Sequence, residues 1–335
     1  MISRLEVGPD VDRREYGEPR ALRLGAFVTC LARYLHIAET QRCFVWAESK
    51  TEPMQQTNEI RRVIVAVLDG LRPDAIDAFD LNHVRRLARL GASTMRGRTV
   101  SPSLTWPALT SLMTGVAPDV HDVVADTIKI PRPRKPIVPL PQLLLRHDYP
   151  SFAFMHDIPA IYGMFATRIT ERLGFTSTRF TGDTALDVVM SARPTLSREL
   201  RGFFFFHLAD ADRAGHDHGW MSLQYGDGAR TLDSALALLA SSLDLESDPR
   251  TLLIALADHG GGGVDNTDHE GEHPLNCTIP VIAAGARLPH RALGAVHLLD
   301  VPATTLWALG VDIPRSYSGR VLAEAFAPDD ASAVA

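Results

Sequence analysis

The feature that most constrains the fold is a series of short, nearly uninterrupted apolar runs that alternate with helical patterns. The clearest runs are residues 63–68, 203–209, 252–257 and 279–284, with a weaker one at 152–155. Helical patterns occur at residues 106–114, 140–146, 184–191, 229–243 and 302–309. Runs of this kind are typical of strands that helices cover on both faces. The sequence therefore predicts an α/β fold with a mostly parallel sheet and helices on both faces.

Acidic and imidazole side chains follow several of these runs. The candidates are Asp69 after the first run, Asp212 and His216 after 203–209, Asp258 and His259 after 252–257, and His269 before 279–284. Ligands of open parallel sheets bind at the carboxyl ends of the strands, so these groups are expected to converge. Each residue alone is more often a cap or turn former. Together, their oxygen and nitrogen atoms predict a site for divalent metals, with enough ligands for two ions.

Thr105 precedes a helical pattern and has two interpretations. Pro107 suits the first helical turn, which puts Thr105 at or beside the N-cap. In the first interpretation, Thr105 only caps the helix. In the second, its hydroxyl lies where the free N–H groups of a helix N-terminus would also bind a phosphate, and a metal ion there would activate it as a nucleophile. The spacing by itself leaves both open.

These segments resemble the alkaline phosphatase superfamily, and within it the nucleotide pyrophosphatase/phosphodiesterase branch. The resemblance covers about residues 61–322. It rests on VLDGLRPD at 67–74, PSLTWPALTSLMTG at 102–115, PDVH at 118–121, DRAGH at 212–216, ADHGG at 257–261, His269, TIPVIAAG at 278–285 and LDVPATTLWALG at 299–310. It implies an alkaline phosphatase-like catalytic domain at residues 58–335, preceded by a helical N-terminal extension at 1–57.

The resemblance also implies a two-zinc site and a chemical mechanism. One zinc would be held by Asp212, His216 and His269, and the second by Asp69, Asp258, His259 and the Thr105 oxygen. The Thr105 hydroxyl would attack phosphorus and form a phosphothreonine intermediate, which is then hydrolysed. The expected activity is therefore metal-dependent hydrolysis of small phosphoester substrates, of the phosphodiesterase or nucleotide pyrophosphatase type.

One position departs from the pattern of this branch, which carries an asparagine about twenty residues after the nucleophile to hold a phosphoryl oxygen. Asp126 stands there. Loss of an oxyanion donor costs about 10²–10³ in rate, so the Trp106 N–H or Arg213 would have to substitute, or the substrate differs. A place for Asp126 in the site and a place in a solvated loop both remain open.

The same scaffold is compatible with other activities. A phosphomonoesterase or phosphonate hydrolase is the nearest alternative, and a metal-binding pseudoenzyme is a third. A sulfatase is disfavoured because none of Cys30, Cys43 and Cys277 begins the Cys-x-Pro-x-Arg pattern that the resemblance would require. Residues 115–203 are also too few for a large cap domain, which predicts an open site.

Several polar residues near the motifs are expected to support the site or lie at the surface. They are His207, Asp210, Asp217, His218 and His273. Arg72 follows Asp69 by three residues and is expected in an ion pair rather than on the substrate. The segment 129–141, which contains five prolines, is expected to be an exposed loop.

Bulk properties exclude some classes of protein. The net charge of −6 gives no basic excess for stable nucleic-acid binding. Three widely spaced cysteines argue against a disulfide framework and against a thiolate zinc site. Residues 21–37 fit an amphipathic surface helix better than a signal peptide or a membrane span. A cytoplasmic location is therefore expected, and the oligomeric state is left open.

Overall fold

The structure, a computed structural model, describes residues 60–126, 132–158, 166–168 and 170–327. Its centre is an eight-stranded sheet with the strand order β4-β3-β5-β1-β6-β7-β2-β8. The strands are β1 (Arg62–Leu68), β2 (Ala92–Arg98), β3 (Ser151–Met155), β4 (Ser177–Phe180), β5 (Gly202–Leu208), β6 (Thr251–Leu256), β7 (Thr278–Gly285) and β8 (Arg291–Ala292). The predicted α/β class is confirmed.

The direction of the strands is mostly parallel, as predicted. β4, β3, β5, β1 and β6 form a continuous parallel block. β7 runs antiparallel to both β6 and β2. The apolar pattern identifies β7 as a strand but carries no information on its direction, since both kinds of buried strand are apolar. The apolar pattern does not reveal β2 and β4, because polar residues occupy more than half of their positions.

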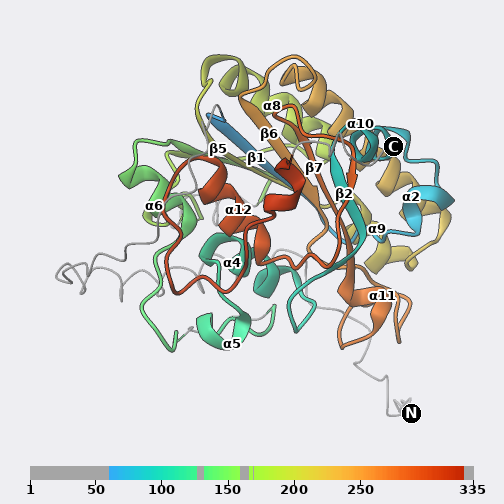
Figure 1. The fold of residues 1–335 in the computed structure, drawn as a ribbon. Coiled ribbons are helices and arrows are strands. Elements are labelled where there is room, and N and C mark those ends of the chain that lie inside the picture. The colour runs from blue at the N-terminus through green and yellow to red at the C-terminus, as the bar shows by residue number, and fades with distance from the viewer. Residues whose placement is uncertain (1–59, 127–131, 159–165, 169, 328–335) are drawn as a thin grey trace, which may run out of the picture.

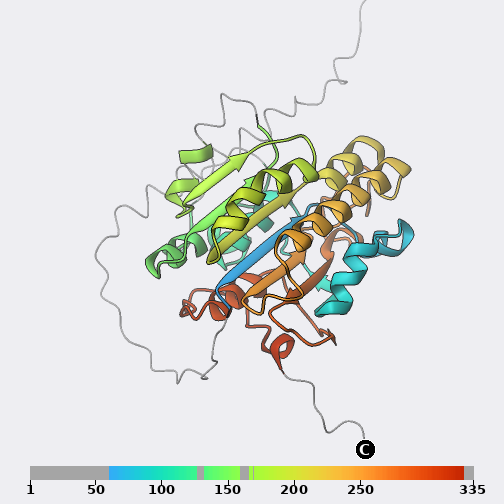
Figure 2. The ribbon, with the colours of Figure 1, turned by 90° about the horizontal axis from the view of Figure 1, so that it is seen from above.

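Helices cover both faces of the sheet (Figures 1 and 2). On one side, α10 (Leu223–Ser242) packs against α3 (Asn82–Leu90), α8 (Ala185–Arg198) and α9 (Asp210–His218). On the other, α4 (Thr105–Thr114), α6 (Leu140–Arg146) and α12 (Asp300–Ala308) pack against one another. Short helices α2 (Ala75–Ala78), α5 (Pro118–His121) and α11 (Pro274–Cys277) and the 3-10 helix η1 (Ala323–Phe326) complete the described elements.

The middle of the sheet is the apolar core. Phe203, Phe204 and Phe206 of β5 are fully buried. Phe204 and Phe206 stack on Phe152 and Phe154 of neighbouring β3, with ring centroids 5.0 and 5.1 Å apart. This packing makes β5 a rigid support for the polar residues that follow it.

Two predicted helices extend further than their patterns indicated. α8 continues to Arg198 because buried positions recur along it, at Val188, Val189, Ala192 and Leu196. α10 begins at Leu223, where the hydroxyl of Ser222 caps it by accepting the Tyr225 N–H. The expected loop at 129–141 is an irregular segment at 132–139, but it ends at α6, which includes Pro141.

The expected N-terminal extension, residues 1–57 with its helix at 21–37, lies outside the described residues. Within the described part of the chain, every helix is too short or too polar to cross a lipid bilayer.

Candidate active site

The parallel strands β5, β1 and β6 are adjacent, so the residues that follow them meet at one edge of the sheet. Asp69 follows β1, and Asp258 and His259 follow β6. Asp212 lies in the first turn of α9, which begins after β5. The predicted convergence of these side chains is therefore present.

Gly70 allows β1 and α9 to approach closely. Its φ angle is +68°, and a Cβ atom there would lie 2.9 Å from the Cα of Asp212. The Asp212 N–H donates to the carbonyl of Asp69 over 3.2 Å. A larger residue would push apart the segment after β1 and the start of α9, so glycine is needed both for its backbone conformation and for its small size.

The three predicted histidine ligands have the same orientation. In each, Nδ1 lies 2.8 Å from a backbone carbonyl: His259 on Gly260, His269 on Ser103 and His216 on Thr267. A carbonyl oxygen can only accept, so each Nδ1 carries the hydrogen. Nε2 is then the lone-pair nitrogen, which is the arrangement of a metal-binding imidazole held by an outer hydrogen bond.

The three predicted carboxylate ligands each have an unsatisfied oxygen. Asp69 Oδ1, Asp212 Oδ1 and Asp258 Oδ2 are buried and have no hydrogen-bond partner among the described residues. Buried polar atoms are nearly always satisfied, and an exception calls for a ligand or ion. The donor set therefore fits a divalent metal centre.

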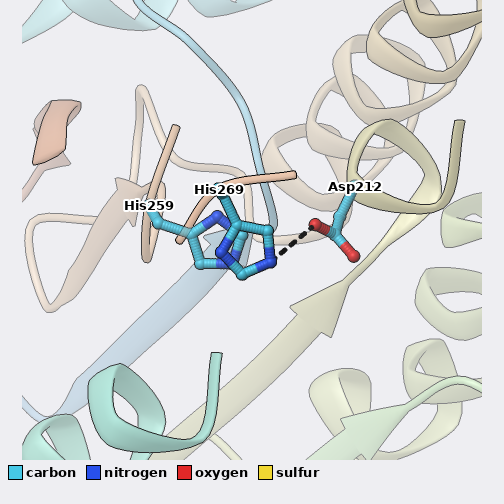
Figure 3. Close-up of side chains that lie close together, drawn as sticks. All are labelled: Asp212, His259 and His269. Atoms are coloured by element: carbon cyan, nitrogen blue, oxygen red, sulfur yellow. Dashed lines mark ion pairs between the residues drawn. The ribbon is translucent and has the colours of Figure 1, made fainter. Parts of the chain in front are cut away.

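Ligand atoms form two groups that share His259. Asp212, His259 and His269 offer atoms within 4.8 Å of one another, as do Asp69, Asp258 and His259. Figure 3 shows the first group, with the two imidazoles facing Asp212; their ring centroids are 3.8 Å apart. His216 adjoins this group, with Nε2 3.5 Å from Asp212 Oδ1. The structure thus brings the six Asp and His ligands of the expected set together.

The electrostatics of the site reflect three buried carboxylates in contact with imidazoles. Burial, with Asp212 and Asp258 nearby, raises the pKa of Asp69 well above its usual value. Burial would raise the pKa of Asp212, but the imidazoles of His216 and His269 hold it below its usual value. Burial opposes the charged form of His259, yet Asp258 and Asp212 raise its pKa. A bound cation would relieve this concentration of negative charge.

Thr105 is the first residue of α4, and its hydroxyl does not cap the helix. Leu104 holds the N-cap position, and α4 has no side-chain cap. The Thr105 Oγ1 atom lies 3.0 Å from Nε2 of His259. The threonine hydroxyl therefore faces the metal-ligand group, which favours the nucleophile over the cap.

Asp126, which follows Trp106 by 20 residues in sequence, also lies at the site. Its Oδ1 atom accepts the N–H of Trp106 over 2.9 Å. Burial raises the pKa of Asp126 to about 6, although the Trp106 N–H opposes this shift. The carboxyl group of Asp126 thus accepts the hydrogen of the Trp106 N–H, which the sequence suggested as a substitute oxyanion donor.

The two arginines considered from the sequence, Arg72 and Arg213, bind groups other than the candidate nucleophile. Arg72 is buried and binds the exposed Asp74 and the carbonyl of Gly261, so the expected ion pair is present at the surface of the protein, with the arginine buried and the aspartate exposed. Arg213 donates to the carbonyl of Asp183 over 2.9 Å at the surface.

The remaining polar residues near the motifs have separate environments. Asp217 and His218 are exposed. Asp210 accepts the Ala185 N–H at the start of α8, and His273 accepts the Leu275 N–H at the start of α11. His207 is different, because its Nε2 atom contacts Asp69 Oδ2 over 2.8 Å.

The sequence did not indicate which groups orient the ligands. The carbonyls of Ser103, Gly260 and Thr267 are backbone atoms, so no side-chain pattern could reveal them. His207 had one signal: it is a polar residue at the end of an apolar strand, directly before a ligand segment.

The architecture is that of the alkaline phosphatase-like fold, as solved structures confirm. The family model "Type I phosphodiesterase / nucleotide pyrophosphatase" matches residues 63–138 and 164–296, which is more than half of the chain. The chain belongs to this family of enzymes that act on phosphoesters.

Relatives with this fold have different activities. A human protein, the catalytic subunit of GPI ethanolamine phosphate transferase 2, is 24% identical over 277 residues. The match covers 78% of this chain but only 27% of the human protein, so the chain spans about a quarter of its curated relative.

Two solved structures illustrate the similarity of fold. Mouse ectonucleotide pyrophosphatase/phosphodiesterase 5 has a TM-score of 0.57 at 12% identity, covering 76% of this chain and 96% of that one. The lipoteichoic acid synthase LtaP from Listeria monocytogenes has a TM-score of 0.58 at 14% identity, covering 85% and 78%.

Proposed function

We propose that this protein is a metal-dependent hydrolase of phosphate esters, of the phosphodiesterase or nucleotide pyrophosphatase type. One observation carries the proposal: the Thr105 hydroxyl lies 3.0 Å from His259 Nε2, beside carboxylates whose buried oxygens lack partners. A hydroxyl that only capped α4 would bond to the helix backbone instead. The family match supports action on phosphoesters.

The ligands divide into two sets in this proposal. Asp212, His216 and His269 would hold one divalent ion, and Asp69, Asp258, His259 and the Thr105 oxygen would hold the other. Mixed carboxylate and imidazole donors favour zinc. When bound, the two ions supply a positive clamp that lowers the pKa of the hydroxyl and stabilises charge on the attacking and leaving oxygens.

Thr105 Oγ1 then forms a bond to phosphorus as the bond from phosphorus to the leaving oxygen breaks. The N-terminal end of α4 favours negative charge on the phosphoryl group held there. Water then cleaves the phosphothreonine and restores the hydroxyl. In the mouse structure, the inactive variant bound to AMP has a threonine replaced by alanine, which is consistent with a nucleophilic threonine.

The human relative favours a second candidate, transfer of the phosphoryl group to an alcohol. The two activities share the phosphothreonine step and differ in whether water or an alcohol cleaves it. Product analysis with added ethanol or glycerol distinguishes them: a transferase yields mainly the new ester, whereas a hydrolase yields mainly the free phosphate product.

The charge around Thr105 favours diesters over monoesters and phosphonates. A monoester brings an additional negative charge, which is best met by an extra cation. Arg72 and Arg213 bind other groups, and Asp126 places a carboxyl group on the Trp106 N–H. We therefore expect the less charged substrate to react faster.

Paired kinetics test the proposal. Protein stripped of metal and reloaded with zinc is assayed on matched aryl phosphodiester, phosphomonoester and phosphonate substrates, with Thr105→Ala as the control. Zinc-dependent diester turnover, absent from Thr105→Ala, is expected. A preference for the monoester would reverse the substrate assignment, and turnover unaffected by chelation would defeat the metal-dependent mechanism.

A further inference from the structure

His207 contacts a candidate metal ligand that the mechanism above already uses. It lies near the end of β5, after four consecutive phenylalanines. Its Nε2 atom lies 2.8 Å from Oδ2 of Asp69, and its side chain is 16% exposed. An imidazole in this apolar strand needs a polar partner, and Asp69 is that partner.

Because of the contact with His207, the two carboxylate oxygens of Asp69 have different environments. Oδ2 is bound by His207, while Oδ1 is buried without a hydrogen-bond partner and lies 3.3 Å from His259 Nε2. Oδ1 is therefore the oxygen on the ligand side. A carboxylate held through one oxygen cannot rotate freely about its χ2 bond, so the other oxygen keeps its direction.

Asp258, the other carboxylate of this ligand group, has the same division. Its Oδ1 accepts the N–H groups of His259 and Gly70, at 3.1 and 3.4 Å. Its Oδ2 is buried without a partner. Backbone N–H groups orient Asp258, whereas a side chain orients Asp69. Asp69 is thus the carboxylate of this pair whose orientation a substitution can test.

We propose that His207 is a positioning residue for the Asp69, Asp258 and His259 metal group: its Nε2–H holds Asp69 Oδ2, so that Oδ1 faces the ion. The proposal rests on the proposed function only in that this group binds a divalent ion. Hydrogen-bond partners of metal ligands orient those ligands, and their loss costs about 10–100-fold in metal affinity.

A ligand role for His207 itself is less consistent with the geometry. Its Nε2 atom is already within hydrogen-bond distance of Asp69 Oδ2. The atoms that gather within 4.8 Å in this part of the site belong to Asp69, Asp258 and His259. His207 therefore acts on the ion through Asp69.

The test compares two amide substitutions that differ mainly in reach. In His207→Gln the amide N–H extends to about the place of Nε2, whereas in His207→Asn it stops near Nδ1. His83→Asn is the matched control, because His83 is exposed on α3, a helix that carries none of the proposed ligands. Zinc affinity of the stripped proteins is measured by competition with a chromophoric chelator, and folding by circular dichroism.

We expect His207→Asn to weaken one of the two zinc sites about 10–100-fold, while His207→Gln stays within about threefold of the wild type. The control should bind zinc as the wild type does. Equal affinity in the Asn and Gln variants, whether both retained or both lost, would overturn the positioning role.

The outcome also separates this proposal from the proposed function. A wild-type protein that binds no zinc would defeat the two-metal mechanism. Wild-type binding with an unaffected His207→Asn variant would defeat only the role of His207. Affinity is measured without substrate, so neither result depends on the reaction.

Discussion

Two buried polar regions meet helix α4 and differ in how fully their hydrogen bonds are satisfied. At the start of α4, Thr105 contacts His259, which lies near Asp69 and Asp258. Each of these two carboxylates has an oxygen that lacks a partner among the described residues. Further along α4, Ser111 lies 2.9 Å from His121 Nε2, and His121 Nδ1 accepts the Val123 N–H over 3.1 Å. Both nitrogens of His121 are therefore satisfied.

The pKa shifts of the two fully buried imidazoles confirm this difference. Burial lowers the pKa of His121 to about 4, so it remains neutral. Burial acts in the same direction on His259, but Asp258 and Asp212 raise its pKa. A neutral imidazole with both nitrogens hydrogen-bonded stabilises the fold. Buried carboxylates with unsatisfied oxygens beside an imidazole instead favour the binding of a cation. Substitutions near Thr105 should therefore lower activity or metal binding, whereas substitutions near His121 should lower the free energy of unfolding.

Replacing the nucleophile should have the largest effect. Thr105→Ala is expected to lower kcat/KM at least about 10³-fold, because among the described residues Thr105 supplies the hydroxyl that lies 3.0 Å from His259 Nε2. Its unfolding free energy and zinc content should change little, since the hydroxyl caps nothing and the Asp and His ligands remain. Thr105→Ser should retain measurable turnover. A Thr105→Ala variant with near wild-type kinetics would leave the hydroxyl without a catalytic role.

Removing a ligand charge should affect metal binding next most strongly. Asp258→Asn is expected to weaken zinc binding by more than about 100-fold, the upper range for groups outside the ligand shell. The metal-free protein should be as stable as the wild type or more so, because a carboxylate that repels the buried Asp69 is replaced by a neutral amide. Chelator competition and urea unfolding measure the two effects. Unchanged zinc affinity would place the ions elsewhere.

Disrupting the satisfied region should produce the opposite result. His121→Ala leaves the Ser111 hydroxyl and the Val123 N–H without their partner and opens a cavity, which together cost about 3 kcal/mol of unfolding free energy. Folded protein should bind zinc with wild-type affinity. Urea unfolding of the metal-free protein gives the stability. Loss of zinc affinity without loss of stability would contradict the structural role.

The pH dependence of stability should also show the structural role of His121. Its folded pKa of about 4 lies below the unfolded value of about 6.5, so the unfolded chain binds the additional proton first. This contribution is intact above pH 6.5 and declines by about 1.4 kcal/mol per pH unit as the pH falls toward 4. His121→Gln should flatten this slope in metal-free protein. An unchanged slope would assign the acid sensitivity to other groups.

The smallest expected effect is a change of substrate preference at Asp126. Asp126→Asn should raise diester kcat/KM about tenfold, because an amide can donate to a phosphoryl oxygen where a carboxylate repels it. The ratio of diester to monoester rates on matched aryl substrates measures this change, with the wild type as reference. A fall in diester turnover would indicate that the carboxyl group of Asp126 is itself required.

Much of the fold could be predicted because burial leaves a clear pattern. β1, β5 and β6 are apolar over most of their length, and each is followed by acidic residues, which histidines accompany after β5 and β6. The end of α8, the start of α10, and strands such as β2 were harder to predict. Their boundaries depend on which face packs against a neighbour, and a single sequence does not show this.

The sequence by itself determined an α/β sheet and the kinds of side chain that follow its strands, carboxylates and imidazoles, together with a hydroxyl at the start of a helix. Those properties follow from residue type and from the local periodicity of strands and helices. Only the tertiary structure decided that Thr105 faces His259, that Asp126 binds the Trp106 N–H, and that His207 holds Asp69. These contacts join residues 20 to 154 positions apart, so their geometry depends on how the strands align and which face each side chain takes.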